Sequence, residues 1–305
     1  MMEENKTLEV KIQKLKQERN AIILAHNYQL GEVQDIADFA GDSLDLSRKA
    51  AATDAEVIVF CGVHFMAETA AILSPNKTVL LPDQHAGCPM ADMVDADSLR
   101  DMKAKHPNAV VVTYVNSTAE VKAESDVCCT SANAAKVVAS IPADREILFV
   151  PDQYLGTFAQ EQTGRKLILW PGYCPTHRRI RPEHIEQRKR QYPEAKVVVH
   201  PECRPEVTRL ADGVLSTSGI CQFARETEAQ TIIVGTELGI LHRLQKENPD
   251  KQFIPVTEQA VCPNMKWVTL EKVLWSLSEN QHHVKINEDI RVRAEKALQR
   301  MLEVS

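Results

Sequence analysis

Short apolar runs alternate with amphipathic stretches along most of the chain, and each run ends abruptly in polar residues. Runs of four or five β-branched and aliphatic residues are typical of buried strands. The predicted strands cover residues 21–25, 56–60, 78–81, 109–113, 146–150, 166–170, 195–199, 231–234 and 252–256. Because amphipathic stretches separate them, these strands are expected to be parallel and joined by right-handed crossovers.

This pattern occurs three times. The first strands of the three thirds begin at Ala21, Ala109 and Ala195, which are 88 and 86 residues apart. Each is followed by an acidic stretch that is predicted to be helical, and then by a small polar residue that opens another helix. These helix starts, which are favourable places for anions, are Ser43, Ser131 and Thr217. We therefore predict an α/β fold of three homologous three-layer α/β/α domains, with parallel sheets in a pseudo-threefold arrangement around a central active site.

The repeat sets the domain boundaries, because no Pro-, Gly- or Ser-rich linker marks them. The first domain is expected at 1–107 and includes an amphipathic leading helix; the second is expected at 108–193 and the third at 194–280. The remaining segment, 281–305, carries apolar residues at every fourth position and is predicted to form a helix that packs back on the first domain.

Three Cys-Pro dipeptides follow the same repeat. Cys88, Cys174 and Cys262 are 86 and 88 residues apart, and each comes just after the third strand of its domain. If the domains are related by rotation, the three thiolates converge and can bind a metal, either a catalytic zinc or an iron-sulphur cluster with one open iron. The spacing does not choose between these. Cysteines in or beside apolar segments are interpreted as small buried side chains: Cys61, Cys128, Cys129 and Cys221.

Composition and charge narrow the class of protein. The 305 residues are 44% hydrophobic and carry a formal net charge of −6, so the chain can bury a large core and offers no basic face for nucleic acid. No apolar run approaches the roughly 18 residues of a membrane span, and the N-terminus is charged rather than signal-like. A cytoplasmic protein without nucleic-acid or membrane partners is expected.

Polar side chains stand directly after the first strand of each domain, where ligands bind in parallel α/β sheets. His26 and Tyr28 follow the first strand, Tyr114 and Asn116 hold the equivalent places in the second domain, and the third domain has His200 and Glu202. We refer to these three pairs as the strand tips. Histidine, tyrosine and glutamate together are a set of proton donors and acceptors suited to general acid–base chemistry.

Eight motifs that include these residues resemble quinolinate synthase, in the order found in that family and over about residues 20 to 280. They are Ala25-His-Asn-Tyr-Gln29, Gly41-Asp-Ser43, Cys61-Gly-Val-His-Phe-Met66, Ala86-Gly-Cys88, Thr113-Tyr-Val-Asn-Ser117, Pro171-Gly-Tyr-Cys-Pro-Thr-His177, His200-Pro-Glu-Cys203 and Cys262-Pro-Asn-Met265. The resemblance implies three α/β domains in one chain and a 4Fe-4S cluster bound by Cys88, Cys174 and Cys262, the cysteines that the repeat also selects.

The same resemblance implies a reaction. Iminoaspartate and dihydroxyacetone phosphate would condense to quinolinate, a precursor of NAD, with loss of phosphate and two waters, and the open iron would act as a Lewis acid. Tyr28, paired with Glu202, is expected to carry the keto–aldo proton transfer with help from His200, and His26 completes the catalytic set. Substrate binding is expected from His26, Ser43, Tyr114, Asn116, Ser131, His177, His200, Glu202 and Thr217. The pathway implies aspartate oxidase as the source of the imine, and a transient association with it is left open.

Two other functions are compatible with the cysteine pattern. A zinc-dependent lyase or hydrolase would use the same three cysteines, with His177 or water as the fourth ligand. A non-enzymatic iron-sulphur redox sensor would need an output surface, and the sequence offers no obvious one. A dinucleotide-binding Rossmann protein is disfavoured because no G-x-G-x-x-G follows any predicted strand.

Overall fold

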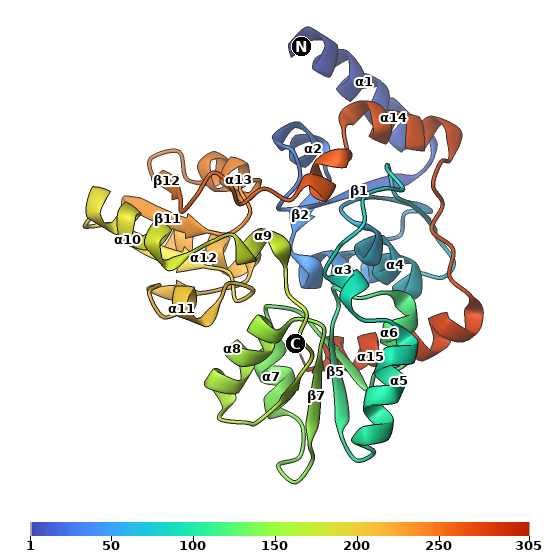
Figure 1. The fold of residues 1–305 in the computed structure, drawn as a ribbon. Coiled ribbons are helices and arrows are strands. Elements are labelled where there is room, and N and C mark those ends of the chain that lie inside the picture. The colour runs from blue at the N-terminus through green and yellow to red at the C-terminus, as the bar shows by residue number, and fades with distance from the viewer. Residues whose placement is uncertain (1, 305) are drawn as a thin grey trace.

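The computed structural model describes residues 2–304, and this part of the chain contains three four-stranded sheets in which every pair of neighbouring strands is parallel. The strand orders are β2-β1-β3-β4, β6-β5-β7-β8 and β10-β9-β11-β12, so the three sheets share one topology. Each sheet forms a separate lobe with its own helices (Figure 1). The predicted fold class, three α/β/α units with parallel sheets, is confirmed.

The elements of the three units follow one another along the chain. The first unit contains α1 (Met2–Glu18), β1 (Ala21–His26), α2 (Gly31–Ile36), β2 (Phe39–Gly41), α3 (Ser43–Ala52), β3 (Val57–Cys61), α4 (His64–Leu73), β4 (Thr78–Leu80) and the 3-10 helix η1 (Ala91–Met93). The second contains α5 (Ala96–Lys105), β5 (Val110–Tyr114), α6 (Ala119–Ala123), β6 (Val127–Cys129), α7 (Ala134–Ala139), β7 (Ile147–Val150), α8 (Gln153–Thr163), β8 (Ile168–Leu169) and α9 (Pro175–Arg178). The third contains α10 (Pro182–Gln191), β9 (Lys196–Val199), α11 (Pro205–Thr208), β10 (Gly213–Val214), α12 (Thr217–Glu226), β11 (Thr231–Gly235), α13 (Ile240–Glu247), β12 (Gln252–Pro255) and η2 (Pro263–Trp267). Two helices, α14 (Leu270–Glu279) and α15 (Glu288–Glu303), end the chain.

A strand of two or three residues lies at one edge of every sheet, in the acidic stretches that the sequence pattern assigned to helix. An aspartate precedes each of these strands and accepts the N–H of the neighbouring first strand at 2.8 Å: Asp38 from Ile23, Asp126 from Val111 and Asp212 from Val197. The helices predicted in these stretches are present as α2, α6 and α11, but the edge strands that follow them were not predicted, because β2, β6 and β10 are too short to show a period-2 pattern. The acidic residue itself completes the hydrogen bonding of the sheet edge.

Helices that precede the first strand of a unit pack onto the sheet that follows. Leu99 of α5 lies in one core cluster with Val111 and Leu148 of the second sheet. In the third unit, Ile185 of α10 lies in one cluster with Val197 of β9. The boundaries expected at 107/108 and 193/194 therefore fall between each leading helix and the sheet it covers.

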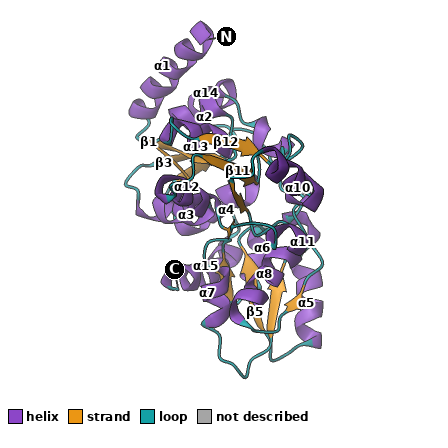
Figure 2. Cartoon of the chain, turned by 90° about the vertical axis from the view of Figure 1, so that its left-hand side faces the viewer, coloured by secondary structure: helices purple, strands orange, loops and turns teal. Residues whose placement is uncertain are grey.

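The C-terminal helices close the assembly. Helix α14 packs on α1 and β3 of the first unit, although it follows the third unit in sequence. Helix α15 contacts α4 of the first unit, as expected, but most of its contacts are with α6 and β6 of the second. Figure 2 shows this second unit below the other two, with α15 beside it. The prediction named the first unit and did not include the second, although the apolar face of α15 spans the junction of both.

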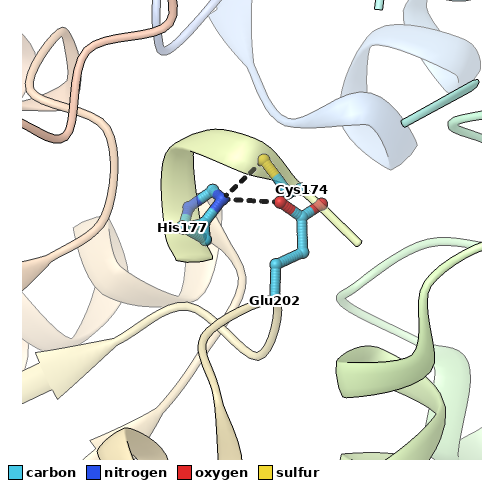
Figure 3. A group of neighbouring side chains, drawn as sticks. All are labelled: Cys174, His177 and Glu202. Carbon is cyan, nitrogen blue, oxygen red and sulfur yellow. Dashed lines mark hydrogen bonds and ion pairs between the residues drawn. The ribbon is translucent and has the colours of Figure 1, made fainter. Parts of the chain in front are cut away.

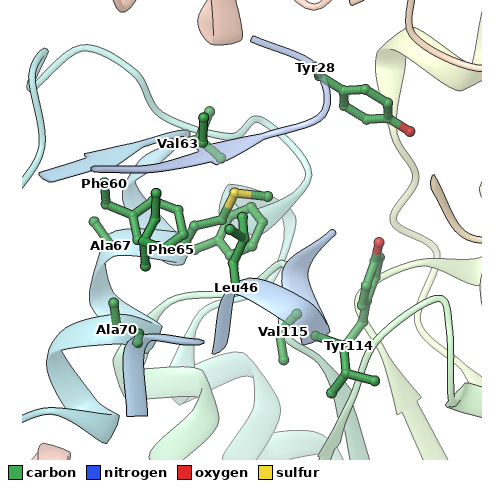
Figure 4. Packing of buried hydrophobic residues seen from close by; sticks show 14 of the residues in the cluster. Tyr28, Leu46, Phe60, Val63, Phe65, Ala67, Ala70, Tyr114 and Val115 are labelled. Carbon is green, nitrogen blue, oxygen red and sulfur yellow. The ribbon is translucent and has the colours of Figure 1, made fainter. Parts of the chain in front are cut away.

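The largest hydrophobic cluster extends through all three units. In the first unit Leu46, Phe60 and Phe65 pack together from α3, β3 and α4, and all three side chains are buried (Figure 4). Two aromatic residues at the border of this cluster, Tyr28 and Tyr114, come from different units and direct their hydroxyl groups toward a common space (Figure 4). None of the helices within residues 2–304 is long and apolar enough to cross a membrane.

Candidate active site

A single pocket at the junction of the three units is lined by every residue that the sequence predicted for the site. They are His26, Tyr28, Ser43, Cys88, Tyr114, Asn116, Ser131, Cys174, His177, His200, Glu202, Thr217 and Cys262. Most of these residues belong to three sets: the strand tips, the helix starts and the Cys-Pro turns. Every unit contributes one strand tip, one helix start and one Cys-Pro turn. The fold therefore concentrates at one point the residues that its repeat places about 87 positions apart.

The first and third strand tips have the same local structure. His26 Nδ1 accepts the N–H of Tyr28 at 3.2 Å, and His200 Nδ1 accepts the N–H of Glu202 at 3.3 Å. Since Nδ1 is an acceptor in both rings, the proton of each neutral imidazole lies on Nε2. His200 Nε2 can thus donate to Ser131 Oγ, which is 3.1 Å away. Burial lowers the pKa of His26 and of His200 to about 3, so both rings are neutral at ordinary pH.

Glu202 is the centre of the polar network. Its Oε1 accepts the hydroxyl of Tyr114 at 2.6 Å and the amide of Asn116 at 3.4 Å, while Oε2 lies 2.7 Å from His177 Nδ1. Burial favours the neutral acid, but His177, His200 and the Tyr114 hydroxyl together hold the pKa of Glu202 well below its usual range. The carboxylate is therefore ionised and, from its place in the third unit, accepts hydrogen bonds from the second.

A chain of hydrogen bonds connects Tyr28 to this carboxylate. Tyr28 Oη is 2.5 Å from Thr236 Oγ1, and Thr236 Oγ1 is 2.8 Å from His177 Nε2. With the hydrogen on His177 Nδ1 directed at Glu202, Nε2 is the ring atom that faces the threonine hydroxyl. The predicted partners Tyr28 and Glu202 are not in direct contact: the Tyr114 hydroxyl occupies Glu202 Oε1, and Tyr28 is connected to the carboxylate through His177, mainly by way of Thr236.

This connection matters because Tyr28 is a poor acid. Burial, reinforced by the negative charge of Glu202, raises the pKa of the Tyr28 phenol well above its ordinary value. The phenol can lose its proton only to a base within hydrogen-bond reach, and the imidazole of His177 is such a base through Thr236. Tyr28, Thr236, His177 and Glu202 therefore form one continuous chain of polar contacts along which a proton can pass.

The helix starts keep their hydroxyl groups on the pocket because neighbouring residues cap the helices. Asp42 caps α3 by accepting the N–H groups of Leu44 and Asp45 at 3.0 Å, and Ser216 caps α12. Ser43 and Thr217 are thus free of capping. The hydroxyl of Thr217 accepts a hydrogen bond from the Asn27 amide at 2.9 Å, which fixes its position across the junction of the first and third units.

The three Cys-Pro turns share a helical geometry. Cys174 and Cys262 directly precede α9 and η2, with proline at the first helical position, and Cys88 precedes η1. Main-chain N–H groups two or three residues further on point at each sulphur: those of Met90 and Ala91 at Cys88, His177 at Cys174, and Asn264 and Met265 at Cys262. Burial raises the pKa of the Cys88 thiol to about 12, an effect that these N–H groups oppose.

One group of side chains is close enough to hold a single metal ion. Among residues 2–304, Cys174, His177 and Glu202 offer three ligand atoms that lie within 4.8 Å of one another (Figure 3). The sulphurs of Cys88, Cys174 and Cys262 do not form such a group in this part of the chain, although all three line the pocket. They are therefore too far apart to share one tetrahedral zinc with Zn–S bonds of about 2.3 Å.

Sequence reasoning missed Thr236 and Glu237, which follow β11. Glu237 is fully buried, accepts the N–H of Cys262 at 3.0 Å and lies 3.0 Å from Lys266 Nζ. It thereby supports the turn that carries Cys262. The positions equivalent to Thr236 in the other sheets are Gly62 and Pro151, so the repeat gave no signal for a functional residue here.

Comparisons with known proteins find relatives that match nearly the whole chain. The family model described as "Quinolinate synthetase A protein" matches residues 10–303. A protein of Dehalococcoides mccartyi named quinolinate synthase is 65% identical over 294 residues, which cover 96% of this chain and 97% of the relative. Quinolinate synthases of Desulforudis audaxviator and Thermodesulfovibrio yellowstonii are 59% and 57% identical, over 97% and 98% of both chains respectively.

Proposed function

Because the chain belongs to the quinolinate synthase family, we propose that it condenses iminoaspartate with dihydroxyacetone phosphate to form quinolinate, with loss of phosphate and two waters. The observation that carries this proposal is the convergence of three cysteines, an acid–base relay and three helix starts on one pocket. Two substrates that carry carboxylates and a phosphate need all three: a Lewis acid, a proton shuttle and anion-binding hydroxyls.

The cofactor in this proposal is a 4Fe-4S cluster bound by Cys88, Cys174 and Cys262. Three observations support it: the sulphurs line the pocket, they are too widely spaced for a single ion, and each accepts main-chain N–H groups. In a cluster each thiolate binds a different iron, so the sulphurs need not meet, and N–H groups directed at sulphur tune such centres. When bound, the cluster supplies an open iron that acts as a Lewis acid toward a carbonyl or a departing hydroxyl.

The strand tips and helix starts would divide the remaining work. Ser43, Ser131 and Thr217 present hydroxyls that can donate to carboxylate and phosphate oxygens. Tyr114 and Asn116, both already bound to Glu202, would hold the substrate or the growing ring on the side of the second unit. His26 and His200 are neutral and would act as hydrogen-bond donors rather than as fixed positive charges.

Tyr28 is the proposed proton carrier of the keto–aldo step. In the resting site its O–H can donate to Thr236 Oγ1, and the threonine hydroxyl can donate to His177 Nε2. Transfer along this chain would give a Tyr28 phenolate and a His177 imidazolium that faces the Glu202 carboxylate at 2.7 Å. The phenolate would take a proton from one substrate carbon, and the phenol so formed would deliver that proton to the neighbouring atom. The reverse transfer from His177 through Thr236 would then restore the Tyr28 phenol.

Iminoaspartate is unstable in water, so a reaction that oxidises aspartate has to supply it near the pocket. A transient association with aspartate oxidase in the cytoplasm would serve this purpose. Coupled assays in which the two proteins are mixed, compared with assays in which they are held apart by a dialysis membrane, test whether contact is required. Equal rates in both would contradict the association without affecting the proposed reaction.

Anaerobic purification tests the proposed function directly. The chain should carry about four irons and form quinolinate from iminoaspartate and dihydroxyacetone phosphate. Serine at position 88, 174 or 262 should abolish iron retention, whereas Cys61→Ser and Cys203→Ser, matched controls at buried cysteines, should keep it. Full activity of a colourless, zinc-loaded protein would overturn the cluster, and absence of quinolinate from an iron-loaded protein would overturn the reaction.

A further inference from the structure

A second hollow lies directly outside the active-site pocket, and we call it the outer hollow. Asp42 and Ser131 line both spaces, so the two share a wall. The segments that begin α3, α7 and α12 form this wall. On α3, for example, Ser43 lines the pocket whereas Leu44 lines the outer hollow. A molecule in the outer hollow is therefore separated by this wall alone from the hydroxyl groups proposed to bind substrate.

The lining of the outer hollow is cationic, in a chain whose net charge is −6. Its charged side chains are Arg48, Lys136, Arg225 and Arg243, with Asp42 and Asp45. Both carboxylates are engaged at the wall, because Asp42 accepts a hydrogen bond from Ser216 at 3.1 Å and Asp45 accepts one from Ser218. Arg225 and Arg243 share one counter-ion, Glu247, at 2.9 Å and 2.6 Å.

Arg48 and Lys136 differ from the other cations. Both side chains are exposed, and within residues 2–304 neither makes an ion pair or hydrogen bond. They occupy equivalent positions, 88 residues apart, each five residues after the pocket-facing serine of its helix segment. The third equivalent position is Gln222, which also lines the outer hollow. Two free cations at matched places around one opening contribute nothing to the fold, but they can attract an anion.

We propose that the outer hollow is the entrance for the dianionic substrates, and that Arg48 and Lys136 concentrate these substrates at the pocket. This inference rests on the proposed function, because it takes its ligands, a dicarboxylate and a phosphate monoester, from that reaction. A net negative protein repels dianions over most of its surface, so a local positive field determines where they approach. Since the two cations are exposed, their field should be strong at low salt and screened at high salt.

Charge reversal tests this entrance. In the iron-loaded chain, the double variant Arg48→Glu, Lys136→Glu should raise KM for dihydroxyacetone phosphate by about threefold or more at about 0.01 M ionic strength, with kcat unchanged. The difference should vanish toward about 1 M salt, where the Debye length is about 3 Å. Binding of quinolinate, also a dianion, measured by calorimetry should weaken in parallel and gives a readout independent of turnover.

A matched control separates local from global charge. The double variant Lys105→Glu, Arg179→Glu changes the net charge equally at two exposed cations that line neither the pocket nor the outer hollow. It should leave KM near that of the unaltered chain. An equal rise of KM in both double variants, or no rise in either, would contradict the proposed entrance. Continued quinolinate formation in the same assays would leave the proposed function unaffected. Failure of the unaltered chain to form quinolinate would instead overturn the proposed function, and this inference with it.

Discussion

Replacing Thr236 by valine should stop the proposed proton relay while it preserves the shape of the site. Valine fills nearly the same volume but lacks the hydroxyl that lies 2.5 Å from Tyr28 Oη and 2.8 Å from His177 Nε2. Without it, the phenol and the imidazole keep only their direct contact of 3.4 Å, a long and therefore weak O–H···N hydrogen bond. Positioned proton transfer contributes about 10²- to 10⁴-fold to a rate, so kcat should fall by that factor, equivalent to about 3–5 kcal/mol in the activation barrier.

The assay is anaerobic quinolinate formation, with iron content and thermal unfolding measured on the same samples. Loss of two buried hydrogen bonds should cost about 1–3 kcal/mol of unfolding free energy, which a protein of this size tolerates. Thr236→Ser is the matched control, because it retains the hydroxyl and loses only the methyl group. If the valine and serine variants had kcat values within about threefold of each other at equal iron content, proton transfer through Thr236 would be refuted.

Three further predictions concern buried polar groups. Burial lowers the pKa of His200 to about 3, so between that pH and about 6.5 the unfolded chain binds a proton at this residue and the folded chain does not. The unfolding free energy, measured by urea titration, should therefore decline as the pH falls from about 6.5 toward 3, and should decline less steeply in His200→Gln. The buried ammonium of Lys122 donates to the Ser117 carbonyl at 2.6 Å, and Lys122→Met should lower the unfolding free energy by about 1.5–3 kcal/mol; an unchanged urea midpoint would contradict this. Asn116→Asp would place a second carboxylate beside Glu202 Oε1, and two carboxylates at this distance cannot both ionise. The kcat of this variant should therefore be low at pH 8 and recover toward pH 6, whereas Asn116→Ala should show no such trend.

The period of the chain was sufficient to predict the nine main strands and those residues of the pocket that repeat in all three units. This works because equivalent positions in three rotated units face one axis, so a residue such as Ser131 can be placed from its counterpart Ser43. Contacts across the axis could not be predicted in this way. Whether Glu202 meets Tyr28 or Tyr114 depends on the tilt of one unit against another, which periodicity does not encode.

Short and unrepeated features were also beyond the sequence pattern. The edge strand β10 has two residues, Gly213 and Val214, and a segment of this length shows no alternation that could identify it. The leading helices α5 and α10 were recognisable only as amphipathic, and amphipathicity does not say whether a helix covers the sheet before it or the sheet after it. The sequence therefore predicted which residues form the site better than it predicted which of them contact one another.

The three units differ in residue type where the proposed chemistry is asymmetric and agree where it is symmetric. Cysteine occupies the turn position in all three units, as a cluster with three equivalent irons to bind would require. The second position of the strand tips holds tyrosine, asparagine and glutamate, and only Glu202 of these is ionised. Three carboxylates there would repel one another in a buried pocket and would share protons instead of directing them. Proton transfer in one direction requires groups of different acidity, and three identical groups around an axis would not differ in acidity. The different residue types at the strand tips are therefore required by the proposed chemistry and are not a loss of the repeat.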